Sequence, residues 1–470
     1  MIFSRATIAR FSLLLCLLLP VLWMDAAGAV KKRKPARPPH GAVHPKKGKA
    51  NRPARPAHPA RPKRSARPSR VRRTAPRPKP AIALVPLDAE KIPPVDLEMP
   101  RGALDPFFRD LSALETPAGD NGAVRVVRIL HLGDSHVAAD YWTGEIRRRL
   151  QERFGDGGAG IVMPGRPWKY FRHAQAKSLD GDGWHTSGLK DAPADGVLGL
   201  SGVAMAPRGN APASVLAPGR RFNVLLASET DRAAVRLFLD GVPFDNVSIR
   251  TRWLNSGGSD IALVTISNRE PLPDAHGKLS VVAAPDSGIR LLGAEFFSGR
   301  SGVVVDTLGL NGARMTALDK WSPRMRQQLL QEAKPSLIIV SYGTNEIATP
   351  HFTFEAFRAD CVRVLRALRE DSGGTAVLVT GPIDRAIRKK RARISMADAE
   401  RPVVRALREA AAETGCAFWD AQQAMGGEGA ILSWMRAGLA RNDGVHLTQQ
   451  GYELQGKMLF DRLMSAYAAR

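Results

Sequence analysis

The sequence predicts an α/β fold: a three-layer, doubly wound parallel sheet with an inserted all-β, jelly-roll-like domain. Two observations lead to this prediction. Apolar strand-like runs alternate with helical periodicity in two stretches, residues 125–158 and 303–470. Between them, residues 159–302 are rich in Gly, Pro, Ser and Asp, and short apolar runs are separated by turn signals, which is typical of an antiparallel β module.

The first 29 residues have the pattern of an export signal that is removed from the mature protein. Arg5 and Arg10 precede an apolar run over residues 11–24, and residues 27–29 offer a small-x-small cleavage site. The run is too short for a comfortable membrane span. We therefore expect an exported protein of the periplasm or cell envelope that meets the membrane only transiently through its signal peptide, with an uncleaved anchor as the alternative.

Residues 30–80 form what we call the basic arm. It contains 19 Lys and Arg residues and no Asp or Glu, whereas residues 81–470 carry only +4 of the formal net charge of +24. A chain of this composition cannot bury enough apolar surface to offset its entropy, so we expect an extended, disordered segment. Such an arm is expected to bind an anionic envelope polymer or lipid headgroups, and a solvated spacer is the alternative. Nucleic acid is not expected as a partner of an exported protein.

Residues 81–124 predict a linker and one short helix, which Asp105 caps, with Pro106 in its first position and an end near Glu115. The next stretch, residues 125–158, begins with a buried strand. Its helix is predicted from apolar residues at helical spacing, namely Trp142, Ile146, Leu150 and Phe154.

Gly133-Asp134-Ser135-His136 stands between that strand and that helix. A serine on such a turn exposes its hydroxyl at the carboxyl edge of the sheet, with its N–H at the positive end of a helix, where a nucleophile is useful. Taken alone, the segment favours an Asp/Ser helix cap.

The remaining elements follow in order. In the insert we expect strands at Phe222–Leu226, Ala234–Leu239, Leu279–Ala283 and Ile289–Phe297. Residues 303–470 predict strands at Val303–Leu308, Leu337–Val340, Ala376–Thr380 and Ala417–Trp419, and helices at Met315–Ala333, Phe354–Glu370 and Arg401–Thr414, with a last helix capped by Thr448. Cys361 lies on an apolar helical face and is expected to be buried, while a disulfide with Cys416 stays open.

A serine nucleophile needs a base, a group that orients the base, and donors for the oxyanion. His131 lies inside the first strand, and His136 follows Ser135 directly, so neither turns back easily onto that hydroxyl. Three histidines lie in the insert (His173, His185 and His276), three lie in the basic arm, and this leaves His351 and His446.

The pattern Asp-x-x-His occurs twice, at Asp182/His185 and at Asp443/His446, so the spacing alone is not decisive. Only the second copy lies in a loop between the last strand and the last helix, where the carboxyl edge of the sheet is expected. Two further loops follow strands at this edge and end in Gly312-Ala313 and Gly343-Thr344-Asn345. Each is ordinary turn chemistry by itself.

Together, the GDS turn, the glycine loop, GTN and DxxH resemble the four blocks of the SGNH, or GDSL-type, hydrolase superfamily. The resemblance implies that Ser135 is the nucleophile, His446 the base and Asp443 its orienting partner. It also implies an oxyanion hole made of the Ser135 and Gly312 N–H groups and the Asn345 side chain, and no metal or other cofactor.

The extended opening over residues 133–144 and the TLG-x-NGA segment at 307–313 are similar to the peptidoglycan O-acetylesterase branch, which carries a carbohydrate-module-like β domain between its first two blocks. This implies an exported serine esterase that removes O-acetyl groups from a cell-wall glycan, with that acetylated glycan as its partner. The alternatives are a glycan O-acetyltransferase with the same triad and a glycan-binding protein with an idle pocket. Glu346 stands where many relatives have Asp, and the basic arm has no counterpart.

Some residues near these blocks stay ambiguous. Glu346 and His351 follow the third block and have either a substrate contact or an ordinary loop role. The insert also contains three tryptophans whose faces suit sugar stacking, although most tryptophans of β modules are core residues: Trp168, Trp184 and Trp253.

Overall fold

The computed structural model describes residues 85–116, 123–193, 195–230, 235–256, 259–273, 277–349, 352–389 and 392–470. The predicted export signal and the basic arm lie outside these residues. Within them, no helix is both long enough and apolar enough to cross a bilayer.

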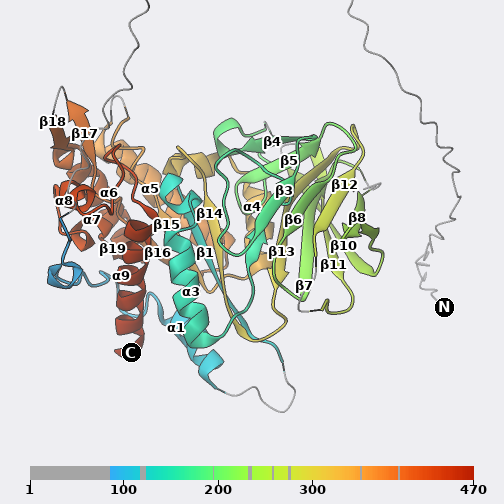
Figure 1. Cartoon of the computed structure of the whole chain (residues 1–470), viewed down its shortest axis with the longest axis horizontal. Coiled ribbons are helices and arrows are strands. Elements are labelled where there is room, and N and C mark those ends of the chain that lie inside the picture. Colours follow the sequence, from blue (N-terminus) through green and yellow to red (C-terminus); the bar gives the residue numbers. More distant parts are fainter. Residues whose placement is uncertain are drawn as a thin grey trace, which may run out of the picture. The chain divides into compact units, whose positions relative to one another are not determined.

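A parallel sheet of five strands, in the order β14-β1-β15-β16-β19, lies at the centre of the α/β part (Figure 1). Its strands are β1 (Val126–Gly133), β14 (Gly302–Gly309), β15 (Leu337–Ser341), β16 (Ala376–Thr380) and β19 (Ala417–Trp419). Their sequences are almost continuous apolar runs because both faces of such a sheet are covered. All the residues of β15, β16 and β19 are buried.

Helices cover both faces of this sheet and give the predicted three layers. On one face they are α1 (Asp105–Glu115), α3 (Trp142–Phe154) and α9 (Gln449–Ala468), and on the other α4 (Pro323–Ala333), α5 (Phe354–Asp371) and α6 (Ala397–Glu413). Each layer has its own apolar core. Short helical turns complete this part: η1 (Ala89–Lys91), α2 (Ser135–Ala138), η3 (Met315–Lys320), α7 (Ala421–Ala424) and α8 (Ala430–Arg436).

The insert is an all-β module of antiparallel strands, as predicted (Figure 1). One sheet has the order β10-β11-β7-β13-β5-β4, with β2 paired to β13, and the second has the order β3-β6-β12-β8-β9. An apolar core fills the space between them. The strands are β2 (Gly160–Val162), β3 (Lys177–Asp180), β4 (Trp184–Gly188), β5 (Val203–Pro207), β6 (Ala213–Leu216), β7 (Arg221–Ser228), β8 (Val235–Leu239), β9 (Val242–Pro243), β10 (Val247–Ser256), β11 (Ser259–Asn268), β12 (Leu279–Ala283) and β13 (Ile289–Phe297), and the turn η2 spans Leu189–Asp191.

A buried cluster of charges joins the module to the parallel sheet. Arg128 of β1 donates from Nε to Asp306 of β14 at 2.5 Å and forms an ion pair with Glu295 of β13 at 2.7 Å. The second carboxylate oxygen of Asp306 accepts the N–H of Ile161 at 2.6 Å. The apolar core on this side of the sheet also combines residues of both parts. The pair with Glu295 and the bond from Ile161 therefore form only while module and sheet are packed together.

Three helix predictions differ from the structure. The predicted helix Met315–Ala333 is two elements, η3 and α4, because Pro323 begins a new helix whose cap is the Ser322 side chain, which accepts the N–H of Met325. Asp105 is the first residue of α1 rather than its cap, since Leu104 occupies the cap position without a side-chain bond. Helix α6 begins at Ala397, four residues before the predicted start.

The hairpin after β16 was not predicted, and the disulfide question that the sequence left open is answered. Between β16 and α6 the chain forms an antiparallel hairpin of β17 (Ala386–Lys389) and β18 (Ala392–Ser395). Cys361 is buried, as predicted, and Cys416 is buried as well; both are free, so they do not pair with each other. Burial raises the pKa of each thiol.

Two fully buried carboxyl groups, Asp384 and Glu400, lie beside this hairpin. The Gln422 side-chain amide donates to both, at 3.0 Å and 2.5 Å respectively. Burial, and then the neighbouring Asp384 carboxyl, raise the pKa of Glu400 to about 9. In the unfolded state Glu400 loses its proton near its ordinary pKa of about 4.3, whereas in the folded state it keeps the proton up to a pH of about 9. The folded state is therefore progressively destabilised relative to the unfolded state as the pH rises from about 4.3 towards 9.

Glu400→Gln should therefore weaken this pH dependence, because the amide is neutral at every pH and still has a donor for Asp384. Between pH 7 and pH 9 the variant is expected to retain on the order of 2 kcal/mol of unfolding free energy that the unaltered protein loses. Urea unfolding at the two pH values measures this, with Glu409→Gln on the exposed side of the same helix as the control. If the unfolding free energies of all three proteins changed equally between pH 7 and pH 9, the assignment of a protonated Glu400 would be wrong.

Candidate active site

Ser135 is the first residue of the short helix α2, directly after β1 ends at Gly133. Asp134 occupies the cap position, and its side chain accepts the N–H of His136 at 2.9 Å. The helix-cap interpretation therefore holds for Asp134. The same turn leaves Ser135 at the carboxyl edge of the sheet, at a helix end whose first N–H groups have no partner inside the helix.

The Ser135 hydroxyl lies 3.0 Å from Nε2 of His446, which comes from the loop before α9. Nδ1 of His446 lies 2.9 Å from Oδ2 of Asp443. The side chains of His446 and Asp443 are 35% and 46% exposed. The structure thus brings Ser135 together with two residues that lie more than 300 positions later in the sequence, in the order hydroxyl, imidazole, carboxylate.

A tight turn holds the carboxylate in this arrangement. Oδ1 of Asp443 accepts the backbone N–H groups of Val445 and His446 at 2.8 Å and 2.9 Å. Partial burial alone would raise the pKa of Asp443, but these two bonds and the contact with the His446 ring lower it, so the carboxylate stays ionised at neutral pH. The carbonyl of Gly444 accepts the N–H of Ala386, which fixes the loop to the β17–β18 hairpin.

The loops after β14 and β15 reach the same edge. The Asn345 amide donates to the Ala313 carbonyl at 2.8 Å and lies 3.5 Å from Oδ2 of Asp134, so it connects the serine turn to the glycine loop. Gly312 has a φ of +75°, with open space where a side chain would stand. A Cβ at Gly309 would lie 2.2 Å from the N atom of Ala138, so this glycine allows α2 to pack directly on β14.

Glu346 has the loop role that the sequence left open. Its buried carboxylate accepts the N–H of Met315 at 2.7 Å and that of Gly343 at 3.1 Å, and it therefore ties the third block to the segment after the glycine loop. Burial raises the pKa of both Glu346 and its neighbour Asp134, the latter to about 7. His351 lies outside the described residues.

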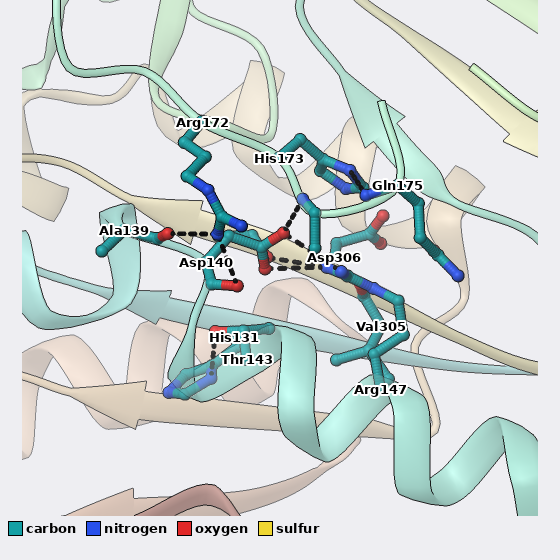
Figure 2. Close-up of polar contacts among 12 residues, drawn as sticks. His131, Ala139, Asp140, Thr143, Arg147, Arg172, His173, Gln175, Val305 and Asp306 are labelled. Atoms are coloured by element: carbon teal, nitrogen blue, oxygen red, sulfur yellow. Dashed lines mark hydrogen bonds and ion pairs between the residues drawn. The ribbon is translucent and has the colours of Figure 1, made fainter. Parts of the chain in front are cut away.

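The other described histidines have partners elsewhere. His131 contacts the hydroxyls of Ser341 and Thr143, the second of which is drawn in Figure 2. Nδ1 of His136 lies 2.8 Å from the Tyr452 hydroxyl. Burial is the main cause that lowers the pKa of His131 and His136, each to about 3. Nδ1 of His185, in the other Asp-x-x-His pattern, lies 3.0 Å from Nη2 of Arg208. His276 lies outside the described residues.

A buried network supports the helix that follows the serine (Figure 2). Both carboxylate oxygens of Asp140 accept from Arg147, each at 3.1 Å. Asp140 also accepts the hydroxyl of Thr307 on β14 and, at 2.5 Å, the N–H of Ala174 in the module. The Arg147 Nε donates to the carbonyl of Val305 at 2.8 Å. Asp140 and Arg147 thus join the first block to both β14 and the module, a role that the sequence did not reveal.

A groove of about 480 Å³ is lined mainly by residues of α3 and by the start of α9. Its lining includes Tyr141, six residues after Ser135, and Gln449, three residues after His446. Its wall also includes Arg172, whose guanidinium lies 4.0 Å from the Tyr141 ring centroid and donates to the Ala139 carbonyl.

The three tryptophans of the insert differ in burial. Trp184 is a core residue whose Nε1 donates to Ala211, and Trp168 packs edge-on against Phe171. Trp253 on β10 is half exposed. Across the part of the chain that the structure describes, no three His, Cys, Asp or Glu side chains form a group that suits a metal ion.

Residues 283–454 match the GDSL-like lipase/acylhydrolase family. The matched stretch contains Asn345, Asp443 and His446. Ser135 lies outside it, earlier in the sequence and before the module. No curated protein sequence matches the chain significantly.

Solved structures with a similar fold were also found. One, described as a peptidoglycan O-acetylesterase in action, has a TM-score of 0.64 and 24% identity, and covers 80% of this chain and 99% of its own. A lipase/acylhydrolase from Enterococcus faecalis has 20% identity and a TM-score of 0.27, and covers 35% of this chain and 77% of its own. The first likeness extends over the α/β part and the module together and establishes the fold.

Proposed function

We propose that this protein, whose residues 283–454 belong to the GDSL-like lipase/acylhydrolase family and whose fold is that of an SGNH hydrolase, is an exported serine esterase that removes O-acetyl groups from peptidoglycan. The observation that carries the catalytic part is the chain of contacts from the Ser135 hydroxyl through His446 to Asp443. The substrate part is supported by the likeness to a solved structure described as a peptidoglycan O-acetylesterase, which includes the β module.

In this proposal Nε2 of His446 takes the proton of Ser135 while the serine oxygen attacks the acetyl carbonyl. Asp443 holds the imidazole in the tautomer that has its free nitrogen towards the serine and stabilises the imidazolium that forms. The N–H groups of Ser135 and Gly312 and the Asn345 amide hold the tetrahedral oxyanion. His446 then returns the proton to the glycan hydroxyl that leaves, and water, activated by the same imidazole, releases acetate from Ser135.

Acetate release from purified O-acetylated peptidoglycan is the direct test, with acetylated xylan as the comparison polymer. We expect a higher kcat/KM on peptidoglycan. An enzyme that released acetate from small esters and xylan but not from peptidoglycan would keep the serine mechanism and refute the proposed substrate.

Transfer of the acetyl group to a second glycan, in place of hydrolysis, would use the same residues. Hydrolysis needs only water at the acyl-enzyme, and the side chains of His446 and Asp443, which are 35% and 46% exposed, leave water access. Acetate release should therefore proceed at the same rate with and without added acceptor glycan, and acceptor-dependent turnover would favour the transferase.

Asn345→Ala is expected to lower kcat by about a hundredfold or more, because one donor to the oxyanion is removed. KM should change little, since this donor acts mainly in the transition state. Steady-state kinetics on 4-nitrophenyl acetate provide the measurement. Asn255→Ala, on the exposed strand β10, is the matched control, and thermal unfolding of both variants checks that loss of the bond to Ala313 has not disrupted the loop. A kcat within about threefold of the unaltered protein would exclude Asn345 from the hole.

A further inference from the structure

A loop of the β module carries an exposed ring and several cations. Residues 166–177, between β2 and β3, contain four Lys and Arg residues and no Asp or Glu. The Tyr170 side chain is 69% exposed, more than any other large hydrophobic side chain of the described residues. Arg166 and Lys169 are exposed as well, and Nζ of Lys169 lies 5.4 Å from the centre of the Tyr170 ring. We call residues 166–172 the module loop.

The packing of the module loop holds these side chains in the solvent. The N–H of Phe171 donates to the carbonyl of Trp168 at 3.1 Å and closes a turn whose tip is Lys169 and Tyr170. The rings of Trp168 and Phe171 meet edge to face at 5.1 Å and pack on the apolar core of the module. Because these two rings are anchored there, the tip of the turn presents its ring and its ammonium group to the outside.

Contacts at the end of the module loop join it to the serine turn (Figure 2). Nη1 of Arg172 donates to the carbonyl of Ala139 at 3.0 Å. Ala139 ends the short helix α2, so it lies only about 6 Å along the helix axis from Ser135. Two residues beyond Arg172, the N–H of Ala174 donates to the carboxylate of Asp140 at 2.5 Å. The module loop is therefore fastened one helical turn away from the nucleophile.

A row of rings connects the module loop to the catalytic base as well. The Arg172 guanidinium lies 4.0 Å from the centroid of the Tyr141 ring, which stacks on the Tyr452 ring at 6.3 Å. The Tyr452 ring lies 5.9 Å from that of His136, which in turn lies 5.3 Å from that of His446. These contacts are independent of the backbone bonds to α2. Both sets place the module loop close to the catalytic arrangement.

We propose that the module loop binds the acetylated glycan next to the ester that Ser135 attacks, with the Tyr170 ring on a sugar face and with Arg166 and Lys169 on carboxylates of the peptide substituents. Tyrosine suits the first contact because its ring offers a flat apolar face. Exposed ammonium and guanidinium groups attract carboxylates, and no acidic residue between positions 157 and 179 competes for them. This inference rests on the proposed function for the identity of the glycan.

The first test removes two charges, with the double variant Arg166→Gln/Lys169→Gln in the full-length protein. We expect kcat/KM on O-acetylated peptidoglycan to fall about tenfold at low salt, the lower end of the effect of electrostatic steering on association. The loss should shrink as added salt screens the charges. Activity on neutral acetylated xylan, and on 4-nitrophenyl acetate, which is too small to span the serine and the loop, should stay within about twofold.

The matched control is Arg101→Gln/Arg109→Gln, which removes two exposed cations far from the site. Both arginines line a hollow together with Arg470, just beyond the carboxyl end of α9. The 20 residues of this helix separate that end from the His446 loop by about 30 Å. The control variant should therefore match the unaltered protein on all three substrates.

The second test removes the ring. Tyr170→Ala is expected to lower kcat/KM about fivefold on peptidoglycan and on xylan alike, because contact with a sugar face does not depend on charge. Activity on 4-nitrophenyl acetate should again stay within about twofold. Tyr170→Phe is the control, since it keeps the ring and should retain at least about half of the activity on both polymers.

Equal losses on peptidoglycan and on 4-nitrophenyl acetate, or a charge variant no more impaired than its control, would overturn the inference. Failure of the proposed function has a different signature. If the unaltered protein is inactive on peptidoglycan but prefers acetylated pectin, which carries carboxylates, to acetylated xylan, and the charge variant loses that preference, the module loop keeps its assignment and only the named glycan is wrong.

Discussion

Ser135→Ala is expected to lower kcat on any acetyl ester by about 10⁴-fold or more, the largest effect of any single change in this protein. The hydroxyl lies 3.0 Å from Nε2 of His446 and is the only nucleophile in the described arrangement of Ser135, His446 and Asp443. Without it no acyl-enzyme forms, and only binding and the oxyanion donors still accelerate the reaction. Release of 4-nitrophenol and of acetate would both report the loss.

The variant should retain its fold, because Ser135 is the first residue of α2 and alanine is well tolerated in a helix. A serine-directed phosphonate should label the unaltered protein once and the variant not at all. Ser248→Ala, on the exposed strand β10, should be fully active and fully labelled. Substantial esterase activity in Ser135→Ala, or labelling at another residue, would refute the nucleophile assignment and with it the proposed mechanism.

Asp140→Ala should reduce the unfolding free energy by about 3–5 kcal/mol. The change leaves the buried guanidinium of Arg147 without its carboxylate and removes the acceptor of the Thr307 hydroxyl and the Ala174 N–H. Urea unfolding followed by far-UV circular dichroism would measure the loss. If the variant folds too poorly for this measurement, Asp140→Asn gives a smaller loss of the same sign, because the amide keeps one acceptor.

Glu152→Ala is the matched control for this stability effect. Glu152 also pairs with an arginine of α3, Arg148, but at the surface, where an ion pair contributes about 0–1 kcal/mol. If the two alanine variants were equally stable, the Asp140–Arg147 pair would contribute no more than a solvent-exposed contact, and its role in holding the first block would be wrong.

The sequence predicted best those parts of the fold that depend on local pattern. The buried strands Ala376–Thr380 and Ala417–Trp419 were predicted with their observed ends, because apolar runs bounded by turn residues have few alternatives. The cap at Thr448 was equally clear, since its side chain accepts the N–H of Gly451. The division of residues 315–333 was predicted wrongly, although Ser322-Pro323 is itself a signal for a helix start.

The approach of Ser135, His446 and Asp443 followed from topology, because loops after parallel strands meet at one edge of the sheet. Contacts between distant side chains had no such signal. Three such contacts depend on how loops from different strands pack. They are the bond from the Met315 N–H to Glu346, the pair of Asp140 and Arg147, and the bond from Arg385 to the Thr344 carbonyl. Sequence spacing does not encode these distances, so the supports of the site became visible only in the folded chain.

The charge cluster of Arg128, Asp306 and Glu295 limits how this protein can be shortened. Removal of the insert would leave a guanidinium and a carboxylate in the sheet without one of their partners, and would expose the apolar surface that both parts share. Isolation of the module would leave Glu295 without Arg128, its partner in the sheet. Any truncated version used to separate catalysis from glycan binding therefore has to retain both parts, and point substitutions are the sounder way to assign their contributions.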